Sequence, residues 1–262
     1  MWTLLLTLKF KNMIRLIIFT VTFLFTVLAS AQVSENRNVS SFSKIKVSTS
    51  IDLVFTQDSK TSVKVEADDA ERLQAIVTKV SGNTLEVYVD SKNLKGKTKN
   101  FKTLKVWVSA PSVDSFQASS SSSVTLKNGI EVKTANVEVS SSADFNGKIK
   151  ADEIKLSVSS SGSLKSAVSS KKLNVEVNSS AEAILSGTAE NINVSASSSA
   201  DFQGKELTVK NAIVEVSSSA EVVLTITESL KAKATSSGSV SYYGNPKNVE
   251  SEKNSSGSIT KK

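Results

Sequence analysis

A pair of serines followed by a small residue recurs through the C-terminal half of the chain at a nearly constant spacing. Measured at the small residue, the successive steps are 21, 19, 19, 19, 20, 18 and 19 residues. Self-similarity at a fixed period is typical of repeat architectures, whereas a serine-rich linker has no reason to keep a period. The eight copies end in Ser122, Ala143, Gly162, Ala181, Ala200, Ala220, Gly238 and Gly257.

Apolar residues form columns at fixed distances from these small residues. Around Ala181, for example, Leu173, Val175 and Val177 precede the serine pair with one polar residue between each two, and Ala183 follows Ala181 after one polar residue. Alternation with a period of two indicates strands with one buried face. A repeat of about 19 residues is too short for a βαβ unit, which needs about 30 residues. The pattern therefore predicts an all-β fold, a single-stranded parallel β-helix (β-solenoid) in which each repeat forms one coil.

The Ser-Ser-small motif marks the corner of each predicted coil. A serine hydroxyl is short enough to bond backbone groups that leave the ladder at a bend, and the small residue lets neighbouring coils approach. The alternative is that stacked hydroxyls form a polar surface for a glycan or for ordered water. In the last coil Ser251 and Lys253 replace valines, which indicates a polar C-terminal cap. Residues 116–262 are accordingly assigned to the repeat solenoid.

Residues 42–115 are expected to form an elaborated N-terminal part of the same solenoid. A short helix is predicted over residues 69–79, with Asp68 and Glu71 in capping-box-like spacing. Strands are predicted at residues 85–89 and 104–108, where Tyr88 and Trp107 point away from the apolar side. The two rings are candidate ligand-binding residues, as a sugar-stacking pair. The alternatives are helix packing and cross-strand pairing.

The N-terminus has the plan of a secretory signal peptide. Residues 1–31 contain Lys9, Lys11 and Arg15, then an apolar run, then Ala29-Ser30-Ala31 as a cleavage site. The run is shorter than the about 20 residues that span a membrane, so cleavage is favoured over an uncleaved anchor. Met13 is an alternative start. Residues 32–41 are expected to be a linker, and the mature chain is expected to be exported, without stable membrane insertion.

Charge and composition exclude several classes of function. Loss of the three basic residues of the signal lowers the formal net charge from +7 to +4, and the remaining basic residues are almost all lysines, so nucleic acid is not an expected partner. A lysine-rich loop at residues 92–102 is a candidate contact for an anionic polymer, with a solvated loop as the alternative. Cysteine and histidine are absent, which removes disulfides and imidazole or thiolate chemistry; no cofactor and no metal site are predicted.

Acidic residues follow three consecutive corners. The repeat places Glu182, Asp201 and Glu221 in one column, so these carboxylates are further candidate ligand-binding residues. Calcium favours such oxygen ligands, but a calcium site needs 6 to 8 of them. The alternative to a binding role is that these three side chains are simply solvated. Paired carboxylates also occur in polysaccharide-active enzymes of this architecture. Such clefts usually add arginine, histidine or aromatic side chains, so an enzyme is only a remote alternative.

The residues together resemble a known family of exported bacterial domains, the putative autotransporter adhesin, head GIN domain. The similarity covers about residues 42–245 and rests on Phe42–Val47, the following strand and helix pattern, Leu85–Val89, Leu104–Val108 and the Ser-Ser-small repeats. It implies a right-handed parallel β-helix on an exported protein of a Gram-negative bacterium, located in the periplasm, on the outer surface or outside the cell. It implies no catalytic residue.

These observations favour a non-enzymatic envelope or surface protein, an adhesin that binds glycan or protein on a solenoid face. The alternative is a periplasmic structural or regulatory component of the envelope. The two differ in whether the domain is exposed on intact cells.

Overall fold

Stacked β-coils make up nearly all of the described structure. The computed structural model describes residues 32–90, 92 and 104–262, and the predicted signal peptide and most of the lysine-rich loop lie outside these residues. Residues Val33–Lys262 form one compact unit. The described elements, in chain order, are β1 (Val33–Arg37), β2 (Lys44–Val47), β3 (Asp52–Gln57), β4 (Ser62–Ala67), α2 (Ala70–Ala75), β5 (Ile76–Ser81), β6 (Thr84–Val89), β7 (Leu104–Ala110), β8 (Ser115–Ala118), β9 (Ser123–Leu126), β10 (Ile130–Val139), β11 (Asp144–Val158), β12 (Ser163–Val177), β13 (Glu182–Ala196), β14 (Asp201–Val216), β15 (Glu221–Ala234), β16 (Ser239–Tyr243), β17 (Asn248–Lys253) and β18 (Ser258–Lys261).

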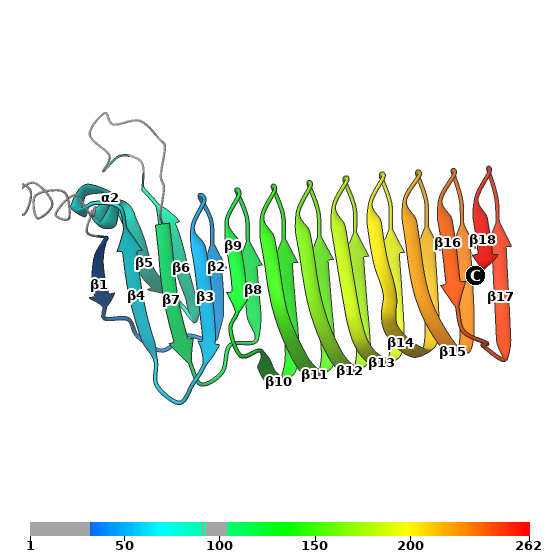
Figure 1. The fold of residues 1–262 in the computed structure, drawn as a ribbon, viewed down its shortest axis with the longest axis horizontal. Coiled ribbons are helices and arrows are strands. Elements are labelled where there is room, and N and C mark those ends of the chain that lie inside the picture. Colours follow the sequence, from blue (N-terminus) through cyan, green and yellow to red (C-terminus); the bar gives the residue numbers. More distant parts are fainter. Residues whose placement is uncertain (1–31, 91, 93–103) are drawn as a thin grey trace, which may run out of the picture. The chain divides into compact units, whose positions relative to one another are not determined.

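Each regular coil is one long strand bent back on itself, followed by a serine turn. Strand β11 pairs in parallel with β12, so that Phe145 lies beside Leu164 and Val158 beside Val177. The same parallel pairing continues through β13, β14 and β15. Figure 1 shows the coils side by side, with the serine turns along one edge and the bends along the other. The predicted β-solenoid with coils of about 19 residues is confirmed.

The bent strands form two layers that enclose the core. Segments that leave a serine turn, such as β3, β9 and the first half of β11, form what we call the post-turn layer. Segments that lead into a turn, such as β2, β8 and the second half of β10, form the pre-turn layer. The predicted apolar columns point between the layers, and Leu173 and Val177 are fully buried. Burial of these side chains drives the stacking, at about 1.5 to 3 kcal/mol for each large one.

The serine turns use a backbone conformation that serine seldom adopts. Both central residues have a left-handed φ, for example 55° at Ser141 and 57° at Ser142. This is the pair of conformations that type I′ turns require, and it occurs in every Ser-Ser turn and at Thr49-Ser50. Left-handed backbone costs a residue with a Cβ atom about 1–2 kcal/mol.

Backbone groups, rather than serine hydroxyls, pair with one another in these turns. The amide of Ala143 donates to the carbonyl of Ser140 at 3.2 Å, and the amide of Ser142 donates to the carbonyl of Ser160 in the next coil at 3.1 Å. The expected hydroxyl-to-backbone bonding does occur at Ser122, whose Oγ donates to the Val47 carbonyl at 3.3 Å. The ladder between coils therefore continues around the corner, and the two central serines of each turn are exposed.

Glycine in place of one turn serine is expected to stabilise the protein. Ser142→Gly removes the left-handed strain and keeps the backbone bonds, at some cost in chain entropy, so we expect a gain of about 0.5–1 kcal/mol and a melting temperature about 2 °C higher. The control is Ser157→Gly in β11, where the backbone is extended and glycine should lower stability. A melting temperature that falls equally in both variants would contradict the strain at the corner.

Antiparallel strands elaborate the N-terminal end. Strand β4 pairs antiparallel with β1 and β7, and β5 pairs antiparallel with β6. Strand β6 then joins the pre-turn layer through β2, and β7 joins the post-turn layer through β3. Residues Val33–Arg37, within the segment expected to be a linker, form strand β1 of this sheet.

The predicted helix is present but shorter than expected. Helix α2 ends at Ala75, and its N-cap is Asp69, whose carboxylate accepts a bond from the Arg72 amide at 2.8 Å. The prediction of a helix to residue 79 was wrong because Ile76, Val77 and Thr78 are β-branched and begin strand β5. Gly82, with a left-handed φ of 61°, turns β5 into β6. Leu73 packs into the core.

Candidate functional site

The two predicted aromatic residues lie on different layers. Tyr88 is on β6, which pairs with β2 and β5, whereas Trp107 is on β7, which pairs with β3 and β4. Each ring has a lysine over it: Lys79 Nζ is 5.8 Å from the Tyr88 centroid, and Lys105 Nζ is 5.1 Å from that of Trp107. Because the two rings lie on different layers, the structure does not bring them together as the predicted sugar-stacking pair.

The predicted carboxylate column is present. Glu182 lies beside Asp201, and Asp201 beside Glu221, in consecutive coils. The Asp201 carboxylate accepts a hydrogen bond from Gln203 Nε2 at 2.7 Å. Within the described ranges, no group of three or more aspartate, glutamate, histidine or cysteine residues has an arrangement that could hold a metal ion. The register thus confirms the column, while a binding role for it stays a prediction.

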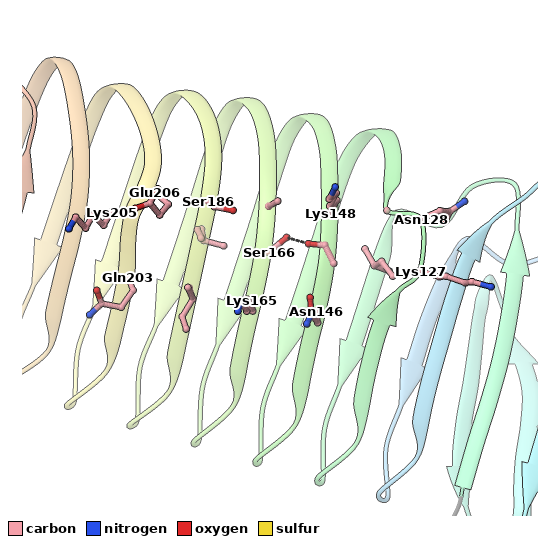
Figure 2. Close-up of a pocket in the computed structure, with 16 residues that line it drawn as sticks. Lys127, Asn128, Asn146, Lys148, Lys165, Ser166, Ser186, Gln203, Lys205 and Glu206 are labelled. Atoms are coloured by element: carbon pink, nitrogen blue, oxygen red, sulfur yellow. Dashed lines mark hydrogen bonds between the residues drawn. The ribbon is translucent and has the colours of Figure 1, made fainter.

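A groove on the post-turn layer is a concave site that several coils line together. It encloses about 630 Å³ near the bend of the coils and crosses the strands. Figure 2 shows its side chains distributed over successive coils. We call it the lysine groove; it is lined by Leu126, Lys127, Asn128, Gly129, Asn146, Gly147, Lys148, Lys165, Ser166, Ala167, Ile184, Leu185, Ser186, Gln203, Lys205 and Glu206.

The groove lies between the two coils that are longer than the regular repeat. The 21-residue step contains the loop Lys127-Asn128-Gly129, in which Gly129 has a left-handed φ of 77°. The 20-residue step contains Lys205 and Glu206, where the pairing of β13 with β14 is broken by a bulge. Extra residues protrude at both ends because the coils between them keep the regular length.

Short side chains form the floor between these two ends. Ala167 and Ser186 are outward-facing and half-buried, so the surface is low at these coils. Behind them Ser166 is buried, and its hydroxyl donates to the Gly147 carbonyl at 3.0 Å. Gly147 has no room for a side chain, since a Cβ there would lie 2.5 Å from that of Leu126. The floor is therefore fixed by close packing of neighbouring coils.

The loop at one end of the groove is also held in place. Gln57 in β3 donates from its backbone amide to Asn128 Oδ1 at 3.0 Å, and Asn128 Nδ2 donates back to the Gln57 carbonyl at 3.0 Å. The Gln57 side chain accepts from the Glu131 amide at 2.8 Å. These bonds give the Lys127 end a defined position instead of a free loop.

The lysines of the groove differ from those at the bend. Along the bend, lysines pair with carboxylates of the neighbouring coil, as Lys150 does with Glu131 at 2.7 Å and Lys171 with Asp152 at 2.8 Å. The Lys171 ammonium lowers the pKa of Asp152, through a hydrogen bond first and its charge second. None of the described ion pairs involves the groove lysines, which are Lys127, Lys148, Lys165 and Lys205.

The groove therefore presents positive charge and hydrogen-bond donors. The lining contains four lysines and only one carboxylate, that of Glu206. Its side-chain amide groups come from Asn128, Asn146 and Gln203. The regular columns of the sequence do not indicate this site, because its two ends lie in irregular coils. The signal was present in the two longer steps of the repeat, which mark both ends of the groove.

The fold and this groove define a class: a β-solenoid that offers a concave, basic lateral surface. The chain belongs to the family described as putative auto-transporter adhesin, head GIN domain, whose model matches residues 41–246. The family resemblance stated from the sequence is thereby confirmed. A comparison with functionally curated proteins finds no match.

Several solved structures are similar to this chain in fold. A putative lipid binding protein from Parabacteroides distasonis is 21% identical, with a TM-score of 0.81 over 89% of this chain and 98% of that one. A putative adhesin from Parabacteroides merdae is 17% identical, with a TM-score of 0.80 over 89% and 97%. A putative adhesin from Bacteroides fragilis is 20% identical, with a TM-score of 0.62 over 89% and 98%. At these identities the likeness concerns the fold.

Proposed function

We propose that this protein is a non-enzymatic, adhesin-like protein of the cell envelope that holds a partner on its solenoid surface. The observation that carries the proposal is the lysine groove, a concave site with four lysines outside the described ion pairs. The side chains stand on strands whose ladder fixes the spacing, so the site is preorganised for binding. The family description and the adhesin names of two structural neighbours support this proposal.

Two alternatives receive less support from the groove. Acid–base hydrolysis of a glycosidic bond uses two carboxyl groups, whereas the groove lining contains one, that of Glu206. The name of one neighbour refers to lipid binding. The groove floor is formed by half-buried Ala167 and Ser186 rather than by a deep apolar channel, which suits a polar partner better.

The proposal includes export of the mature chain. Residues 1–31 act as a cleaved signal peptide, and the solenoid winds in the right-handed sense that the family resemblance implies. In the part of the chain that the structure describes, no helix is long and apolar enough to cross a membrane. Surface exposure separates an adhesin from a periplasmic component of the envelope.

Protease treatment of intact cells, combined with a deletion strain, tests this function. We expect protease to remove the protein from intact cells, and we expect the deletion strain to adhere less to host or neighbouring cells. The complementing gene should restore adhesion. A protein that is protected from protease until the outer membrane is opened would favour the periplasmic alternative, and unchanged adhesion of the deletion strain would overturn the proposal.

A further inference from the structure

We propose that the partner held in the lysine groove is an extended anionic polysaccharide that lies along the solenoid axis. This inference rests on the proposed function and names the chemical class of its ligand. The acidic groups of the polymer, carboxylates or sulfates, contact the four groove lysines, and its uncharged parts lie on the floor formed by Ala167 and Ser186, beside Ile184.

The spacing of the charges points to a polymer rather than a small ion. Lys127, Lys148 and Lys165 come from three consecutive coils, and Lys205 comes from the second coil after them. Successive coils are about 4.8 Å apart, so the five coils span about 19 Å. The coil without a lysine contributes Ile184 and Ser186 to the lining. A single phosphate or carboxylate contacts only one or two of these ammonium groups, whereas a chain with repeated acidic groups reaches all of them.

The neutral side chains of the groove fit a carbohydrate. Asn146 and Gln203 stand in the same outward column as Lys165 and Ile184. Their amide groups donate and accept hydrogen bonds, as sugar hydroxyls require. At the far end, Lys205 Nζ lies 4.9 Å from the ring centroid of Tyr243, which fixes the ammonium at the rim.

Other anionic polymers fit this groove less well. Single-stranded nucleic acid is bound through aromatic rings that stack on bases, and the groove lining contains no aromatic residue and no arginine. An acidic peptide that adds to a sheet needs an unpaired strand edge. Strands β11, β12 and β13, which line the groove, are each paired on both sides, so they offer no such edge.

Calorimetric titration of purified residues 32–262 tests the charge requirement. The probes are polygalacturonate, uncharged dextran and a single-stranded oligothymidylate, each at low and at physiological ionic strength. We expect binding of polygalacturonate that weakens with salt, and no binding of dextran. The double variant Lys148→Glu/Lys165→Glu should weaken polygalacturonate binding about tenfold or more.

The matched control places the same charge change on exposed lysines away from the groove. Lys133→Glu/Lys155→Glu alters two exposed lysines of β10 and β11 that do not line it, and should change the affinity less than about twofold. Equal losses in both double variants would overturn the groove as the site. Oligothymidylate bound as tightly as polygalacturonate would overturn the polysaccharide assignment.

A second variant tests shape without a change in charge. Ser186→Trp fills the floor of the groove and should weaken polygalacturonate binding about tenfold or more, whereas Ser157→Trp on the pre-turn layer should leave it unchanged. Circular dichroism of both variants shows whether the fold is retained. Full affinity in a folded Ser186→Trp protein would contradict binding in the groove.

The two proposals fail in different ways. If the deletion strain loses adhesion but the purified protein binds no anionic polysaccharide, the ligand class is wrong and the adhesin-like function stands. If groove variants lose polygalacturonate binding but the deletion strain adheres normally, the ligand class stands and the adhesin-like function is wrong.

Discussion

Val177→Asp is expected to lower the stability of the solenoid by at least about 4 kcal/mol, because it places a carboxylate in the fully buried column between the layers. Val177 lies between Val158 and Ala196 of the neighbouring coils, so no polar partner faces the new charge. For a domain of this size the loss corresponds to a melting temperature lower by about 10 °C or more. Thermal unfolding followed by circular dichroism at 218 nm measures it.

The position of Val177 makes the effect extend beyond one coil. A solenoid is stabilised by contacts between nearest neighbours, so a defect in β12 separates the coils before it from those after it. The control is Ser169→Asp, which puts the same carboxylate on an exposed position of the same coil and should change stability by less than about 0.5 kcal/mol. If the Val177→Asp protein had the same melting temperature as the Ser169→Asp control, the assignment of Val177 to the core would be contradicted.

Gly187→Ala should have the second largest effect. Gly187 has a left-handed φ of 104°, and a Cβ atom there would lie 2.2 Å from the Val168 carbonyl oxygen of the coil before it. Backbone atoms of a paired strand cannot move aside as the end of a side chain can. Strain and overpacking together are expected to cost about 3 kcal/mol, a melting temperature lower by about 10 °C.

Gly82→Ala separates these two contributions. Gly82 also has a left-handed φ, of 61°, but nothing lies within 4 Å of the position of its Cβ. Alanine there should cost only the conformational strain, about 1 kcal/mol. Equal melting temperatures for the two variants would show that the coils at Gly187 separate freely, contrary to the close stacking in the structure.

The sequence predicts those parts of the fold in which apolar residues can be buried in only one way. Val175 and Val177 alternate with polar residues, and only an inward position buries them, so the columns and the coil length are correctly predicted. The carboxylate column follows from the same register. The length of helix α2 does not, because Ile76 and Val80 also fit a helical face, and the preference of the β-branched run for a strand takes effect through pairing with β6.

The candidate site could not be predicted from the sequence, because it too depends on strand pairing and on irregular coils. Tyr88 and Trp107 both point outward, but which layer each joins depends on the partners of β6 and β7, which local alternation does not specify. The lysine groove depends on the bulge near Glu206 and on the loop at Asn128, both departures from the repeat. The repeat pattern predicts positions in coils of regular length, whereas the two ends of the groove lie in the coils that are longer than the repeat.

For the proposed polysaccharide ligand, the number of coils between the two ends of the groove sets the length of the bound segment. The two ends are set by irregular coils, and the interval between them is filled by interchangeable units of 19 residues. Duplication or loss of one such unit changes the interval by about 4.8 Å while the residues at both ends stay the same. Relatives with different numbers of units between the same two irregularities would thus be matched to ligand segments of different lengths.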